Sequence, residues 1–174
     1  MYPNSVASAR ELLQQLGAPP HLIRHVELVG EAGERLVAVI ASLGVRANSE
    51  LVRVGIVVHD AGKILHPDEL HVPGAAHEPA GQDLLLQHGV SDEVARICVT
   101  HAQWSNHSVS LEELLVALSD KLWKGVRNLE LEERVVREVA RSLGKDYWDL
   151  FVELDNVFEQ IAADGSDRLQ RSGV

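Results

Sequence analysis

Apolar residues recur every three or four positions along most of the chain, which is the spacing of one face of an α-helix. This pattern predicts helices over residues 6–16, 21–43, 49–58, 77–87, 91–103, 110–127, 129–143 and 145–163. Gly44 is a typical residue beyond a helix end, and Asn48 and Ser110 are typical N-caps. Residues 54–58 alone could form a buried strand, but no second strand candidate pairs with them. The expected fold is all-α, one domain built as a bundle of about seven to eight helices.

Two segments lack the helical period. Residues 62–76 contain two prolines and two glycines and form the longest predicted loop, and long loops in compact domains are often functional. The polar residues 166–174 are expected to form a flexible C-terminal tail. The predicted helical domain therefore spans residues 1–165.

Composition narrows the classes of function. The chain carries 16 basic and 26 acidic residues, a formal net charge of −10. An acidic surface repels phosphate backbones, so no DNA or RNA polymer is expected as a partner. A small anionic substrate remains compatible where bound cations reverse the local field. The single cysteine excludes an intrachain disulfide. No signal peptide is apparent and no apolar run approaches the ~18 residues of a membrane span, so we expect a cytoplasmic protein without membrane contact.

Histidine and aspartate residues at helix ends and on apolar helix faces are the candidate metal ligands. His59 and Asp60 are adjacent and follow a buried run, and His25 lies on the preceding long helix. Asp120 lies on an otherwise apolar helix face, where an unpaired charge is costly and a bound cation would compensate it. Imidazole nitrogen together with carboxylate oxygen suits Fe, Mn, Co, Ni or Zn.

The order of these residues resembles the HD superfamily of metal-dependent phosphohydrolases. The resemblance runs from about Leu12 to Leu122. It is carried by Pro-Pro-His-Leu-Ile-Arg-His-Val-Glu-Leu-Val, by Val-His-Asp-Ala-Gly-Lys and by Ser-Asp-Lys-Leu. It implies an HD-domain-like helical bundle. It also implies a metal ion held by His25, His59, Asp60 and Asp120.

A second metal ion follows if the chain is of the dinuclear, six-ligand type of this superfamily. In that type His77 and His101 occupy the positions of the additional ligands, Asp60 bridges the two ions, and Asp60 is also a catalytic residue. The alternative is that His77 and His101 are ordinary helix-end histidines. The placement of His77 and His101 favours the dinuclear interpretation, and the alternative stays open.

The activity that the resemblance implies is hydrolysis of a phosphate ester or phosphoanhydride in a small molecule such as a nucleotide. Water activated by the metal ions, two divalent transition metals in the dinuclear case, would be the nucleophile. Lys63 is expected to act in catalysis and to hold the substrate phosphate, or else to be a solvated lysine. Lys124 and Arg127 are candidate phosphate contacts; the alternative is a surface pair with Glu130 or Glu132.

Several alternatives remain. His59-Asp60 is followed by Ala61-Gly62-Lys63-Ile64, which contains no carboxylate, whereas HD nucleotidases and alarmone hydrolases have acidic residues there. The sequence also contains no Gly-Tyr-Pro, which argues against the cyclic-dinucleotide phosphodiesterases. HD oxygenases with a mixed-valence di-iron centre share the six ligands, and a non-catalytic nucleotide-binding domain is a third hypothesis. A homodimer face is a further hypothesis, against ordinary core packing, for Leu150, Phe151, Leu154 and Phe158.

Overall fold

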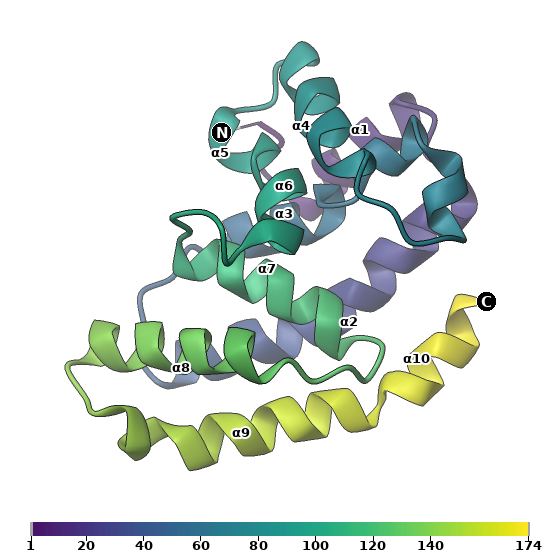
Figure 1. Cartoon of the computed structure of the whole chain (residues 1–174). Coiled ribbons are helices and arrows are strands. Elements are labelled where there is room, and N and C mark those ends of the chain that lie inside the picture. Colours follow the sequence, from purple (N-terminus) through teal and green to yellow (C-terminus); the bar gives the residue numbers. More distant parts are fainter. Residues whose placement is uncertain (1, 174) are drawn as a thin grey trace.

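The computed structural model describes residues 2–173, and over these residues it is all-α and contains no strand (Figure 1). Every helix predicted from the sequence is present. The α-helices are α1 (Val6–Gln15), α2 (Pro20–Ser42), α3 (Ser49–Val58), α4 (His77–Gln87), α5 (Asp92–Ala95), α6 (Ile97–Gln103), α7 (Leu111–Leu122), α8 (Leu129–Leu143), α9 (Tyr147–Ala163) and α10 (Gly165–Ser172). Two 3-10 helices, η1 (Ala61–Ile64) and η2 (Pro67–Leu70), lie within the predicted loop.

The predicted N-caps make the expected hydrogen bonds. The Asn48 side chain accepts a hydrogen bond from the backbone N–H of Leu51 at the start of α3. Ser110 and Glu113 form a reciprocal capping box at the start of α7. These bonds satisfy backbone donors that the first turn of a helix leaves without partners. The starts of α3 and α7, two helices that carry site residues, are therefore fixed by local sequence.

Two helices differ in extent from their prediction. The helix predicted over 110–127 ends at Leu122, because the chain turns through Gly125, whose φ of +80° lies in the left-handed region. The helix predicted over 91–103 is interrupted at Arg96, which separates α5 from α6. Hydrophobic periodicity continues across both positions and therefore does not reveal them.

Helix α3 lies at the centre of an aliphatic core. The side chains of Val52, Val54 and Val58 are fully buried. The helix packs against α1, α2 and α7, and α2 and α7 also contact each other. Burial on all sides explains why its sequence is nearly continuous in apolar residues, although it forms a helix rather than a strand. Its C-terminal end, where His59 follows Val58, is thereby held inside the molecule.

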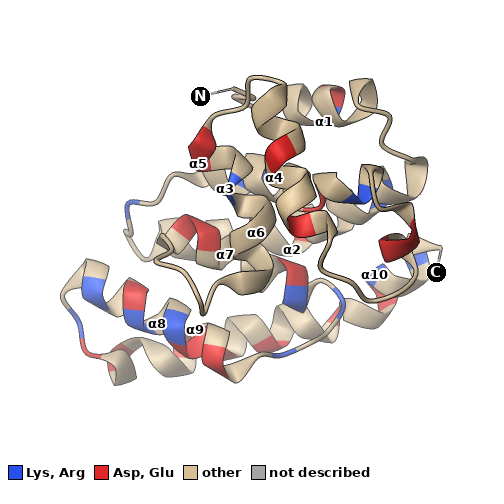
Figure 2. Ribbon diagram, turned by 45° about the horizontal axis from the view of Figure 1, so that its top comes forward, with Lys and Arg blue, Asp and Glu red and all other residues tan. Residues whose placement is uncertain are grey.

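Helices α8 and α9 form an antiparallel pair beside α7 (Figure 1). Three of the four residues considered for a dimer face, Leu150, Leu154 and Phe158, are buried in this packing. Their role in the chain itself is therefore core packing. Residues of both charge signs lie along α8 and α9 (Figure 2). Among residues 2–173 no helix is both long and apolar enough to traverse a bilayer.

The C-terminal residues differ from the expected flexible tail, because residues 165–172 form helix α10, which packs against α2. Arg168 is 2% exposed, and its guanidinium donates hydrogen bonds to the carbonyl oxygens of Trp123 and Ile161, at 3.0 and 2.9 Å. Arg171 forms a two-pronged ion pair with Glu31 of α2. Polar contacts hold this helix in place, so a search for apolar periodicity overlooks it.

Candidate metal site

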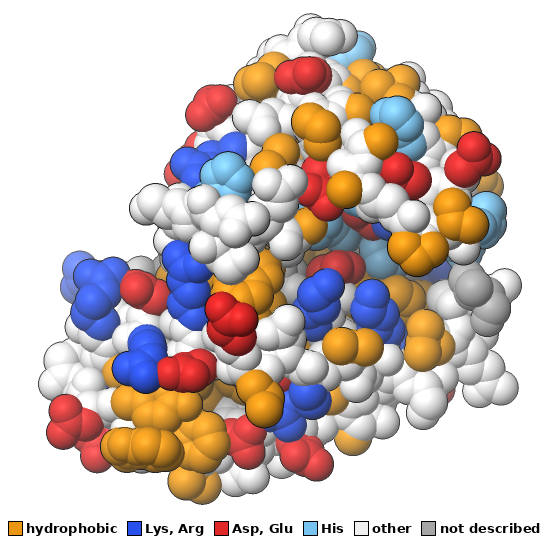
Figure 3. All heavy atoms as spheres, viewed as in Figure 1, with side chains coloured by type: hydrophobic (Ala, Val, Ile, Leu, Met, Phe, Trp, Pro, Cys, Tyr) orange, Lys and Arg blue, Asp and Glu red, His pale blue; other side chains and the backbone are white. Residues whose placement is uncertain are grey.

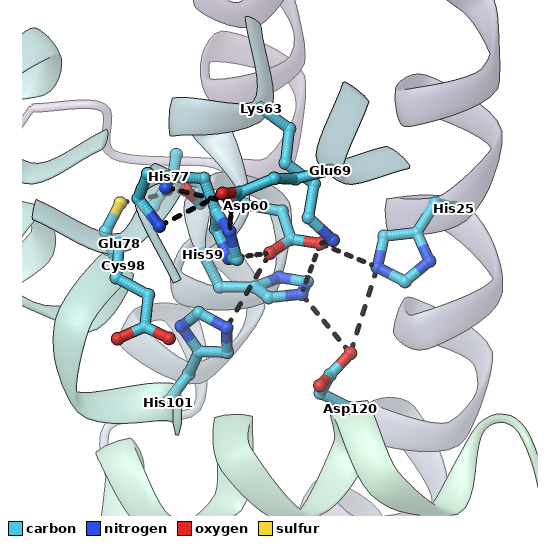
Figure 4. Close-up of polar contacts among 12 residues, drawn as sticks. His25, His59, Asp60, Lys63, Glu69, His77, Glu78, Cys98, His101 and Asp120 are labelled. Atoms are coloured by element: carbon cyan, nitrogen blue, oxygen red, sulfur yellow. Dashed lines mark hydrogen bonds and ion pairs between the residues drawn. The ribbon is translucent and has the colours of Figure 1, made fainter. Parts of the chain in front are cut away.

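Six side chains from five parts of the fold meet at one place (Figure 4). They lie on α2, at the end of α3 and directly after it, at the start of α4, on α6 and on α7. In that order they are His25, His59, Asp60, His77, His101 and Asp120. These are the six residues named from the sequence, and they are separated by up to 95 positions in the chain (120 minus 25).

Asp60 lies at the centre of the cluster and presents its two carboxylate oxygens to different histidines. Its Oδ2 is 3.1 Å from the Nε2 atom of His25 and 3.5 Å from that of His59. Its Oδ1 is 3.2 Å from the Nε2 atom of His77 and 3.6 Å from that of His101. The carboxylate therefore divides the four rings into two pairs.

Asp120 completes the first of these groups. Its Oδ1 lies 3.4 Å from the Nε2 atom of His59 and 3.8 Å from that of His25. Donor atoms of His25, His59 and Asp120 all lie within 4.8 Å of one another, and so do donor atoms of His59, Asp60 and His101. Separations of this size allow several atoms to share one cation.

Three of the rings are oriented through their Nδ1 atoms. Nδ1 of His59 lies 2.7 Å from the backbone oxygen of Ile56, and Nδ1 of His101 lies 3.1 Å from that of Ile97. Nδ1 of His77 lies 2.5 Å from Oε2 of Glu69. Each ring can donate a proton to its acceptor from Nδ1, which leaves the Nε2 lone pair directed at the cluster. This is the usual arrangement of metal-binding histidines.

The cluster fits a cation by its burial as well as its donors. The Nε2 atoms of His25 and His59 are buried and make no hydrogen bond, although carboxylate oxygens are near. Buried polar atoms without partners are uncommon in native proteins and each calls for an explanation. Asp60 is 2% exposed, so its charge also needs compensation. A metal ion would satisfy both requirements at once.

The pKa shifts of His101 and of the two carboxylates suit metal binding. Burial, reinforced by the neighbouring charge of His59, lowers the pKa of His101 to about 4, so this ring is neutral at pH 7. Burial alone would raise the pKa of Asp60 and of Asp120, but the charge and hydrogen bonds of the surrounding histidines hold both well below the usual range. Neutral imidazole and ionised carboxylate are the ligand forms that metals require. Burial alone would lower the pKa of His59 and of His77, but Asp60 and the other carboxylates beside them raise both, so a metal ion would have to displace protons there.

A cavity of about 570 Å³ opens beside the cluster, and a volume of this size suits a small molecule. Lys63, Lys121 and Lys124 line it together with the cluster. Lys63 also donates a hydrogen bond from Nζ to Oδ2 of Asp60 at 2.7 Å. Figure 3 shows basic side chains along one edge of the hollow in which histidines are visible. The cavity thus brings three lysines together with the carboxylates of Asp60, Glu78 and Asp120.

Arg127 does not belong to this cavity, which corrects its assignment as a phosphate contact. Its guanidinium binds the carboxylates of Glu132, Asp155 and Glu159, with Glu132 and Asp155 at 2.8 and 2.6 Å. The reason is the early end of α7: beyond Gly125 the chain turns away, so position 127 no longer shares the helix face of Asp120. The surface pairing with Glu132, the alternative recognised from the sequence, is the one observed.

Two residues beside the cluster were not identified from the sequence. Glu69 lies in η2 and contacts His77; its signal was an acidic residue in the longest predicted loop. Lys121 lines the cavity and directly follows Asp120. Its position next to Asp120 was the available signal, because two consecutive residues near the end of a helix can both line the same cavity.

A close backbone contact fixes the spacing of the two halves of the cluster. A Cβ atom added to Gly62 of η1 would lie 1.8 Å from the carbonyl oxygen of His77, and one added to Gly81 of α4 would lie 2.8 Å from the backbone nitrogen of Gly62. Only glycine permits such an approach. Asp60 and His77 therefore stand on segments that touch through their backbones.

Comparison with known proteins agrees with this geometry. The chain is 31% identical over 140 residues to tRNA (cytidine(56)-2'-O)-methyltransferase of Thermoplasma volcanium, an alignment that covers 72% of this chain but 38% of that relative, so the chain spans well under half of its length. It is 26% identical over 142 residues to an uncharacterized protein of Methanocaldococcus jannaschii, covering 73% of this chain and 80% of that protein. No solved structure matches the chain. The HD domain family matches residues 21–137, which is most of the chain and includes all six clustered side chains, and the chain therefore belongs to the HD domain family.

Proposed function

We propose that this chain is a metal-dependent phosphohydrolase that uses two divalent ions to cleave a phosphate ester or phosphoanhydride in a small molecule such as a nucleotide. One observation carries the proposal: the two oxygens of Asp60 face two separate pairs of histidine Nε2 atoms. A carboxylate placed in this way suits a bridge between two ions. Membership of the HD domain family, whose members are generally metal-dependent hydrolases, supports it.

The residues divide between the two ions according to the oxygen of Asp60 that lies nearer to each ring, although His59 also lies close to His101. His25, His59, Asp120 and Oδ2 of Asp60 would hold the first ion, and His77, His101 and Oδ1 of Asp60 the second. When bound, such ions activate water as a nucleophile and neutralise charge on phosphoryl oxygens.

The chain's own lysines would bind the substrate phosphate. Lys63, Lys121 and Lys124 line the same cavity as the cluster and bring three positive charges to it. In a chain with a net charge of −10, this is where a phosphate would be favoured. Lys63 donates a hydrogen bond to Asp60, so a phosphate bound by Lys63 would lie beside the proposed bridging carboxylate.

Methyl transfer is not extended to this chain from its relative's name. The alignment covers 38% of the tRNA (cytidine(56)-2'-O)-methyltransferase, so that name describes a protein most of which has no counterpart here. The aligned chain instead carries a cluster of imidazole and carboxylate donors. Such donors are those of a transition-metal site.

Elemental analysis of protein purified without added metal tests the proposal. We expect about two equivalents of a transition metal in the wild type, about one in His77→Ala, and close to none in Asp60→Asn, since Asp60 would serve both ions. His88→Ala is the matched control, because His88 is exposed and lies outside the cavity. One equivalent in the wild type, unchanged in His77→Ala, would leave His77 and His101 with structural roles.

The identity of the metal decides between hydrolysis and the oxygenase alternative. Mn, Co, Ni or Zn, with release of phosphate from nucleotides in a phosphate assay, supports hydrolysis. Iron with consumption of O₂ and no release of phosphate would favour the oxygenase. A wild-type protein that binds no metal even after reconstitution would contradict the proposal and leave a binding domain.

A further inference from the structure

Helix α10 forms part of the wall of the metal-site cavity. Leu169 and Ser172 line the cavity together with His25, Asp60 and the lysines. The helix lies outside residues 21–137, the part of the chain that matches the HD domain family. The family match therefore does not cover this part of the cavity wall.

The fold does not need Leu169 to hold α10 in place. Arg168 is buried against backbone carbonyls of α7 and α9, and Arg171 pairs with Glu31 of α2 at 2.7 Å through both nitrogens. A Cβ atom on Gly165 would lie 2.3 Å from the backbone nitrogen of Gly125, so the start of α10 rests directly on the chain beyond α7. These contacts anchor both ends of the helix.

Leu169 is the one apolar side chain among the eight residues of α10, and it is 39% exposed. Leu169 lines the cavity and does not belong to the apolar core. The cluster and the lysines offer charge and hydrogen bonds to a phosphate, whereas Leu169 offers neither. It can contribute only to contact with an uncharged part of a ligand.

We propose that α10 is the specificity wall of this site, with Leu169 and Ser172 limiting the size of the leaving group attached to the phosphate. This inference rests on the proposed function and concerns its substrate class: phosphate esters whose leaving group lies against α10. Helix α10 borders the open cavity of about 570 Å³ on one side, so Leu169 and Ser172 flank the space into which a leaving group would extend from the phosphate. Leu169 is the residue of the wall whose side chain can be enlarged without breaking a hydrogen bond.

Two esters of different size test the wall, namely p-nitrophenyl phosphate and the larger 4-methylumbelliferyl phosphate. We expect Leu169→Trp to raise KM for the larger ester about tenfold more than KM for the smaller one. We expect Leu169→Ala to lower KM for the larger ester. The inhibition constant of inorganic phosphate, which has no leaving group, should stay unchanged in both variants. Gln170→Trp is the matched control, because Gln170 is the exposed neighbour that does not line the cavity.

Equal effects on both esters, a change in phosphate inhibition of the same size, or no effect of Leu169→Trp would overturn the inference. If the wild type hydrolyses neither ester, the proposed function fails separately, and calorimetry in Mn²⁺ then compares inorganic phosphate with adenosine 5′-monophosphate. Weaker binding of the nucleotide alone in Leu169→Trp supports the wall. Equal changes for both ligands, no change, or no binding of either ligand refutes it.

Discussion

At the scale of single residues, Glu69 shows how a side chain outside the cluster controls one inside it. Its carboxylate accepts hydrogen bonds from Nδ1 of His77 and from the backbone N–H groups of Ala76 and His77, at 3.1 and 3.0 Å for the backbone bonds. One carboxylate thereby ties the loop to the first turn of α4. It also fixes the direction in which Nε2 of His77 points.

Replacing Glu69 with glutamine should lower the affinity for one of the two proposed metal ions. An amide lacks the charge that strengthens the bond to His77, and loss of such a supporting group typically costs about 10–100-fold in metal affinity. Titration calorimetry with Mn²⁺ measures it. Asp68→Asn, at the exposed neighbouring position, should bind both equivalents as the wild type does. An unchanged affinity in Glu69→Gln would show that His77 is oriented by other contacts.

The six clustered side chains could be named from the sequence because their order and neighbours follow a motif. Glu69 could not, since its contact depends on the path of residues 62–76, which no short-range pattern determines. The prediction that Arg127 contacts the phosphate was wrong for a related reason. Residues share a helix face only as long as the helix continues, and α7 ends at Leu122. The sequence therefore predicts which side chains cluster more reliably than it predicts the residues that surround them.

At the scale of elements, the contact between η1 and α4 decides how the two halves of the cluster are spaced. Gly62 and Gly81 allow the two backbones to touch. The rigidity of this contact comes from main-chain atoms, which cannot move aside as a flexible side chain can. A substitution at Gly62 or Gly81 should therefore disturb the contact between η1 and α4 directly.

Gly62→Ala should lower the free energy of unfolding by about 2–3 kcal/mol, because its Cβ has no space beside the carbonyl oxygen of His77. Gly30→Ala provides the comparison. Gly30 lies within α2, where an added Cβ meets no atom within 4 Å, so alanine should stabilise the protein by about 0.5–1 kcal/mol. Urea denaturation measures both. Equal stability of the two variants would mean that η1 and α4 separate readily.

Element prediction from the sequence succeeded where apolar residues make the contacts. Helices α2, α3 and α8 follow their hydrophobic faces closely. Helix α10 is held by Arg168 and Arg171, whose partners are backbone oxygens and a glutamate far away in the chain. Such partners are known only once the fold is known.

At the scale of the whole molecule, the distribution of charge matters more than its sum. The formal net charge is −10, yet three lysines gather in one cavity. Long-range attraction of a polyanion depends on an extended basic surface, whereas a small phosphate needs a local one. The charge pattern thus favours small anions over nucleic acids.

The protein should therefore not bind transfer RNA, although one relative is named for acting on it. Fluorescence anisotropy with labelled transfer RNA should show no saturable binding at about 0.15 M salt. A basic RNA-binding protein measured in parallel confirms that the RNA is intact. Saturable binding with a dissociation constant on the order of 1 µM would contradict the inference from charge.

The position of α10 has a practical consequence for handling the protein. Ser172 lines the cavity, so a purification tag fused to the C-terminal end of this chain would emerge beside the opening. A hexahistidine tag there would bring six further imidazoles close to a cluster that is itself rich in them, and could deliver nickel to it. The described part of the chain begins and ends on different sides of the molecule (Figure 1). Metal analysis therefore calls for a tag at the N-terminal end.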